Sequence, residues 1–133
     1  MNNKSKKILS EISPGELLDK ISILEIKLVK IKEETSLREI KKEYQSLIES
    51  KKLHINITKE LEILINKIKE INLKLWNIED KIRICEKNKD FGNEFVKLAR
   101  SVYLNNDERA KLKSNINKIL SSNIKEIKHY VDY

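Results

Sequence analysis

Apolar residues recur along most of the chain at alternating steps of four and three, a spacing that places them on one face of an α-helix. The longest series runs from Ile57 to Cys85 and predicts a single helix of about 30 residues. An earlier series follows the motif SPGE at residues 13–16, in which the serine can cap a helix and the proline suits its first position. We expect this first helix to end at about Glu34.

Two polar interruptions divide the remaining pattern. The Thr-Ser pair at residues 35–36 can cap a second helix that continues to about Lys52. A further helix is predicted to begin near Asn93, after the long one has ended. The Asn-Asn-Asp run at residues 105–107 is expected to interrupt it and to cap a fifth helix.

These elements predict an all-α protein, an antiparallel bundle of four to five helices with one long central helix. Residues 1–12 form a polar arm, residues 13–121 the helical bundle domain, and residues 122–133 a C-terminal tail. The long helix needs a partner of similar length. The first two helices laid end to end can provide it, and so can a second copy of the protein in a homodimer.

Composition supports the helical prediction and limits what the charge means. The 133 residues include two Gly and one Pro, too few for a fold of many short strands or for a glycine-rich phosphate loop. The net charge is +7, but 24 of the 28 basic residues are lysine, and lysines alternate with acids along the predicted helices. The C-terminal third is more basic. A weak nucleic-acid binder is therefore the third-ranked function, and nucleic acid is not the expected partner.

The single cysteine excludes an internal disulfide and fits a reducing compartment. No stretch approaches the ~20 apolar residues of a membrane-spanning helix, and the N-terminus lacks the apolar core of a signal peptide. We therefore expect a cytoplasmic protein with no membrane association.

Four motifs resemble a family of small, uncharacterised bacterial helical proteins that is grouped as a domain of unknown function. They are SPGELLDKISILEIK at residues 13–27, LWNIEDKIRICE at 75–86, DFGNEFVKLARSVY at 90–103 and NDERAKLKSNIN at 106–117. The chain departs from the family pattern mainly at residues 34–57 and in its tail. The resemblance implies no established activity. It suggests a stand-alone module, or an accessory to larger proteins of the surface-polysaccharide or glycosyltransferase type.

The second motif carries the first candidate contact group, which comprises Trp76, Glu79, Asp80 and Arg83. An indole can stack on a ring or sugar, a guanidinium can bind phosphate or carboxylate, and acids can accept from hydroxyl groups. A purely structural interpretation is also open. In that case Trp76 packs against a neighbouring helix, while Glu79 and Arg83 form an ion pair one helical turn apart.

A second candidate group surrounds the predicted turn before the last helix and comprises Arg100, Tyr103, Asn106, Asp107 and Arg109. A helix beginning at Asp107 would offer unpaired backbone N–H groups to an anion. If Arg83 approaches this turn, three arginines converge on one phosphate or carboxylate. In the structural alternative Asp107 only caps the helix, Arg109 is solvated and Arg100 pairs with a nearby acid.

Metal binding and catalysis have weaker signals. Glu16 and Asp19 share a helix face, but metal-binding helical pyrophosphohydrolases use two such pairs and only one is present. His54 and His129 are isolated, and Cys85 occupies an apolar position typical of a small core residue. We therefore expect no metal site, no cofactor and no catalytic residues.

Taken together, the residues favour a non-catalytic binding or protein-interaction module, which the resemblance links to surface-polysaccharide or glycan biosynthesis. The alternative is a binding domain or enzyme for an anionic metabolite such as a nucleotide or nucleotide sugar. The two groups of side chains around Trp76 and Arg109 are the expected contact surface in both cases.

Overall fold

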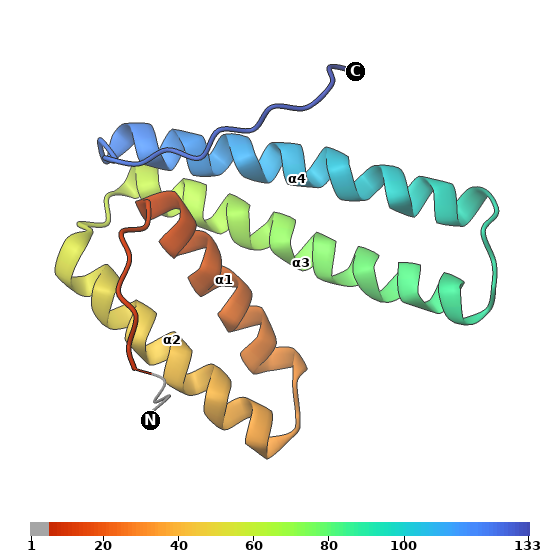
Figure 1. The fold of residues 1–133 in the computed structure, drawn as a ribbon, viewed down its shortest axis with the longest axis horizontal. Helices are drawn as coiled ribbons and strands as arrows, with labels where there is room; N and C mark the ends of the chain where they lie inside the picture. The colour runs from red at the N-terminus through yellow and green to blue at the C-terminus, as the bar shows by residue number, and fades with distance from the viewer. Residues whose placement is uncertain (1–5) are drawn as a thin grey trace, which may run out of the picture.

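The computed structural model describes residues 6–133 and confirms the all-α fold (Figure 1). The five N-terminal residues of the predicted arm lie outside the described part of the chain. The helices are α1 (Pro14–Lys30), α2 (Glu34–His54), α3 (Lys59–Lys87) and α4 (Asn93–Ile119). Within residues 6–133, the segments before α1 and after α4 contain no helix.

Helices α3 and α4 form a long antiparallel hairpin, and α1 lies against one end of it (Figure 1). Helix α2 turns back along α1 and, among the described helices, packs against α1 alone. The expectation that the first two helices lie end to end beside the long helix is therefore wrong. The reason is that α1 is apolar on more than one side, so it needs neighbours on more than one side, whereas α2 has no buried residue.

The start of α1 follows the predicted cap. The Ser13 hydroxyl accepts a hydrogen bond from the Glu16 N–H at 3.2 Å, and Pro14 occupies the first helical position. The helix ends at Lys30, earlier than expected, and the Thr-Ser pair at residues 35–36 lies inside the first turn of α2 rather than capping it. The break between two helices is real, but it falls at residues 31–33.

The predicted interruption at residues 105–107 is wrong, because α4 is continuous through it. The Asn105 side chain donates to the Ser101 carbonyl at 2.8 Å, and the Asn106 oxygen accepts from Arg109 at 3.2 Å. Both amides thus find partners along the helix instead of ending it. Because Asp107 begins no helix, the anion site expected at its backbone N–H groups is absent.

The core lies where α1 crosses the α3–α4 hairpin. Its buried members are Leu18, Leu61, Ile68, Ile71, Leu112 and Ile116. Cys85 is also buried, further along the hairpin, in agreement with its predicted role as a small core residue. None of the helices in the described part of the chain is long and apolar enough to cross a membrane.

Gly15 lets the first turn of α1 approach the backbone of α4. Its N–H donates to the Asn117 side-chain oxygen at 2.8 Å, across 102 residues of sequence. A Cβ atom at this position would lie 2.6 Å from the Lys113 carbonyl oxygen, closer than carbon and oxygen can pack. The contact fixes the position of α1 along the axis of α4. At this position the polar side chains of the two helices, described in the next section, can meet.

Candidate functional site

The centre of the polar site is Asp19, whose side chain is fully buried on α1. The guanidinium of Arg109 on α4 donates two parallel hydrogen bonds to this carboxylate, from Nε to Oδ1 at 2.8 Å and from Nη2 to Oδ2 at 2.5 Å. Asn72 from α3 donates to Oδ1 at 2.9 Å. One buried carboxylate therefore ties three helices together.

Asn72 and Ser22 complete the buried network. The Asn72 amide also donates to the Ser22 hydroxyl at 2.7 Å, and that hydroxyl donates to the Asp19 carbonyl at 2.8 Å. Within residues 6–133, no buried side-chain nitrogen or oxygen lacks a hydrogen-bond partner. A fully satisfied network of this kind holds its members in fixed positions.

A second cation, Lys113, lies one helical turn from Arg109 and is surrounded by acids. Its Nζ is 3.0 Å from a carboxylate oxygen of Glu16, 3.3 Å from one of Glu126 and 3.8 Å from one of Asp19. The Lys113 side chain is 12% exposed, so these are partly buried ion pairs. Glu16 and Asp19 belong to α1, whereas Glu126 belongs to the C-terminal segment.

The ion pairs of the site shift the pKa values of Arg109 and Glu126, each in the direction that favours the charged form. The hydrogen bond with Asp19 raises the pKa of Arg109 further, an effect that burial partly offsets. For Glu126, the hydrogen bond from Lys128 lowers the pKa of the carboxyl, and the charge of Lys113 adds to this effect. Both groups are therefore charged at neutral pH.

An open groove of about 410 Å³ lies beside this network, where α1 diverges from the hairpin. Its lining comes from three helices and consists of Ile23, Ile26, Asn72, Leu75, Trp76, Glu79, Asp80, Arg83, Asn106 and Arg109. The Trp76 ring is half-buried, and Glu79 and Arg83 form the ion pair expected from their spacing, with oxygen and nitrogen 3.1 Å apart. The groove therefore combines one aromatic surface with amide, carboxylate and guanidinium groups.

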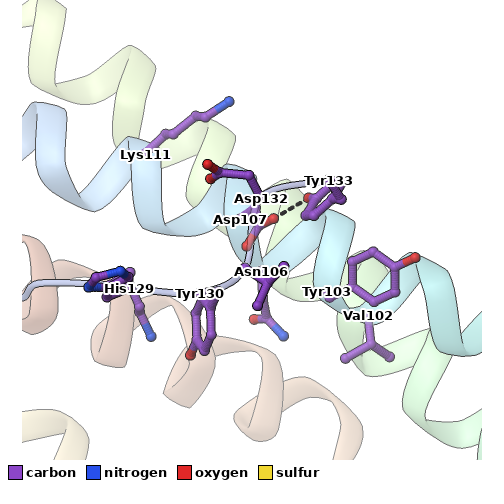
Figure 2. Close-up of a pocket in the computed structure, with 11 residues that line it drawn as sticks. Val102, Tyr103, Asn106, Asp107, Lys111, His129, Tyr130, Asp132 and Tyr133 are labelled. Atoms are coloured by element: carbon purple, nitrogen blue, oxygen red, sulfur yellow. Dashed lines mark hydrogen bonds between the residues drawn. The ribbon is translucent and has the colours of Figure 1, made fainter.

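The structure brings together six of the nine contact residues named from the sequence. Trp76, Glu79, Asp80 and Arg83 from α3 meet Asn106 and Arg109 from α4 along this groove. Tyr103 and Asp107 line a neighbouring pocket beneath the C-terminal segment (Figure 2). Arg100 is exposed on α4 and lines neither space, so the three arginines do not converge.

The structural alternative in which Arg109 is solvated is wrong, since Asp19 binds its side chain. Sequence reasoning also missed Asn72 as a member of the site. A signal was present, because Asn72 lies four residues after Ile68 and three before Leu75, on the apolar series of the long helix. A polar residue at such a position needs a buried partner.

Glu16 and Asp19, the acids considered for a metal, are engaged by Lys113 and Arg109 instead. Among residues 6–133, no group of three or more His, Cys, Asp and Glu side chains is placed to hold a metal ion.

Comparison with known proteins places the chain in a family. It belongs to DUF6165, a family of unknown function, whose model matches residues 8–132. No curated protein and no solved structure matches the chain. The matched residues include those of the groove, those of the buried network and nearly all of the C-terminal segment.

Proposed function

We propose that the protein is a non-catalytic binding module and that the groove around Trp76 is its contact surface. The observation that carries this proposal is the convergence of an accessible indole with polar side chains from three helices. The single tryptophan of a chain with few aromatic residues lies in this groove. Side chains of this kind commonly anchor a bound ring or partner surface.

The charge balance of the groove favours a neutral, hydroxylated ligand such as a sugar ring. Arg109 is held by Asp19 and Arg83 by Glu79, so each guanidinium already has a carboxylate partner. Asp80 adds a further negative charge to the lining. An anion would have to displace one of these carboxylates, whereas sugar hydroxyl groups can donate to them and accept from the arginines.

The groove also favours binding over hydrolysis of a glycan. Glycoside hydrolysis requires two carboxyl groups that face each other across the bond, roughly 5–9.5 Å apart. The two acids of this groove, Glu79 and Asp80, are adjacent on one helix and point roughly 100° apart. Glu79 is moreover paired with Arg83.

Carbohydrate binding agrees with the role that the resemblance implies. We infer a cytoplasmic accessory protein of surface-polysaccharide or glycan biosynthesis, which holds part of a glycan or its carrier. The single, buried cysteine supports the choice of a reducing compartment.

One observation favours the alternative ligand, an anionic metabolite. The Arg83 side chain is 73% exposed, and exposed ion pairs one turn apart contribute only about 0.3–0.5 kcal/mol. Arg83 can therefore leave Glu79 and turn to a phosphate. Nucleoside diphosphates and nucleotide sugars belong in the same binding experiments for this reason.

Replacing Trp76 by alanine is expected to weaken binding of a neutral oligosaccharide about fivefold or more, because stacking of a ligand ring on an aromatic side chain, as measured for nucleic-acid bases, contributes about 1–3 kcal/mol. The probes are neutral tetrasaccharides of glucose, galactose or N-acetylglucosamine, titrated by calorimetry. The matched control is Phe91→Ala, which removes an exposed aromatic ring from the connection between α3 and α4, away from the groove lining.

The carbohydrate proposal fails if Trp76→Ala and Phe91→Ala bind a given tetrasaccharide equally well. It also fails if the unaltered protein binds none of the tetrasaccharides but binds a nucleoside diphosphate, which would establish the alternative ligand.

A further inference from the structure

The C-terminal tail leaves the end of α4 and runs back along it (Figure 1). Two contacts hold the tail against this helix. Glu126 reaches Lys113 at 3.3 Å. Further on, the Tyr133 hydroxyl donates to the Asp107 carboxylate (Figure 2). Tyr130 lies between the two contacts, so the backbone that carries its side chain is held on both sides.

The ring of Tyr130 adds little to the packing of the bundle. This residue is 70% exposed, so most of its apolar surface remains in water. Its ring nevertheless borders a pocket of about 240 Å³ between the tail and α4. An aromatic side chain that the fold places beside a pocket without burying it is available to a ligand.

The pocket is polar, and its charges are already paired. Each of the three cations in its lining has a carboxylate partner at 3.0 Å or less, since Arg109 binds Asp19, Lys113 binds Glu16 and Lys128 binds Glu126. Asp107, the acid of the lining, accepts from the Tyr133 hydroxyl. An ionic ligand would have to break one of these pairs. A neutral, hydroxylated ligand suits the pocket better, because its hydroxyl groups can both donate and accept hydrogen bonds.

This pocket adjoins the groove around Trp76. Asn106 and Arg109 line both spaces, whereas Trp76 borders only the groove and Tyr130 only the pocket. In Figure 2 the side chains of Asn106 and Tyr130 point to the same side of the tail. The Arg109 side chain is 25% exposed, so the boundary between the two spaces is accessible to a ligand. One aromatic ring is therefore offered on each side of this boundary.

We propose that Tyr130 is a second aromatic contact of the sugar groove, and that the ligand is a linear, neutral oligosaccharide long enough to reach both rings. The inference rests on the proposed function, since it requires a sugar chain in the groove. One sugar ring stacks on Trp76, the chain passes over Asn106 and Arg109, and a more distant ring stacks on Tyr130. The site then selects for chain length, because a short saccharide reaches only one of the two rings.

The test compares a neutral tetrasaccharide with the disaccharide of the same sugar and linkage. Both are titrated into the full chain and followed by the NMR signal of the Trp76 indole. Tyr130→Ala is expected to weaken tetrasaccharide binding about fivefold, at the lower end of what stacking contributes for nucleic-acid bases, because most of the Tyr130 ring stays in water. Disaccharide binding is expected to be unchanged. Tyr130→Phe keeps the ring and is expected to bind the tetrasaccharide within about twofold of the unaltered chain.

The matched control is Ile127→Ala. It removes another apolar side chain of the tail, which is 83% exposed and borders neither the groove nor the pocket. This variant is expected to bind both saccharides as the unaltered chain does. All of these tail substitutions lie outside the four helices and the core, so the bundle is expected to fold in each variant.

The outcomes separate the second contact from the groove itself. Equal tetrasaccharide affinities of Tyr130→Ala and Ile127→Ala, with binding still weakened in Trp76→Ala, would overturn the second contact and leave the groove. Equal losses for disaccharide and tetrasaccharide in Tyr130→Ala would also overturn it, because the two rings would then hold the same sugar units. A loss in Tyr130→Phe as large as in Tyr130→Ala would contradict stacking on the ring. If no tetrasaccharide binds the unaltered chain, the groove and the second contact fail together.

Discussion

Replacing Arg109 by methionine is expected to lower the free energy of unfolding by about 3 kcal/mol, because it leaves the fully buried Asp19 carboxylate without its main partner. Asn72 and the more distant Lys113 remain near that carboxylate and keep the loss from being larger. In thermal unfolding the change corresponds to a midpoint lower by roughly 10 °C or more. Urea denaturation measures it directly.

The matched control for this change is Arg100→Met, on the same helix but with no ion pair in the described structure. As a surface substitution it is expected to alter stability by about 0.5 kcal/mol or less. Adding Asp19→Asn to Arg109→Met is expected to restore part of the loss, since the buried charge is then gone. Equal stability of Arg109→Met and Arg100→Met would show that the ion pair does not join the helices.

The second large effect is expected for Gly15→Ala, which should cost about 2–3 kcal/mol through overpacking. The added methyl group would lie 2.6 Å from a backbone oxygen of α4 and 2.8 Å from the Asn117 side chain, so α1 must move away from α4. The sign of this change in the free energy of unfolding is informative, because alanine in place of glycine normally stabilises a helix by about 1 kcal/mol. Denaturant unfolding again gives the magnitude.

The other glycine of the chain is the control. At Gly92 a Cβ atom would meet only a side-chain oxygen of Asp90 at 3.3 Å, and its φ of −78° is open to any residue. Gly92→Ala is therefore expected to change stability by about 1 kcal/mol or less. If Gly15→Ala is as stable as Gly92→Ala, the close approach of α1 to α4 is incorrect.

The helices could be predicted wherever a long apolar series fixed the face of the helix. The 29-residue helix α3 follows the series from Ile57 to Cys85 closely, because repetition over many turns outweighs any single polar residue. The failure at residues 105–107 has the opposite cause. There, local propensity indicated a break, but Leu98, Leu112 and Ile116 pack on both sides of it and keep α4 continuous.

The α3 half of the groove was predictable from spacing along one helix, as the Glu79–Arg83 pair shows. That Asn106 and Arg109 complete the groove was not predictable, because their position beside these α3 residues depends on the register between α3 and α4. The pairing of Asp19 with Arg109 links residues 90 positions apart. A periodic pattern assigns Asp19 to a helix face but contains no information about which distant residue meets it.

The binding surface around Trp76 is tested most directly by the indole ¹⁵N–¹H NMR signal, which is unique because the chain has one tryptophan. The signal is followed during titration with the neutral tetrasaccharides and with a nucleoside diphosphate, each at low and high salt. We predict that a tetrasaccharide shifts it with the same affinity at both salt concentrations, since an uncharged ligand is not screened. A signal that no tetrasaccharide moves, or that only the diphosphate moves at low salt, would contradict a carbohydrate-binding groove.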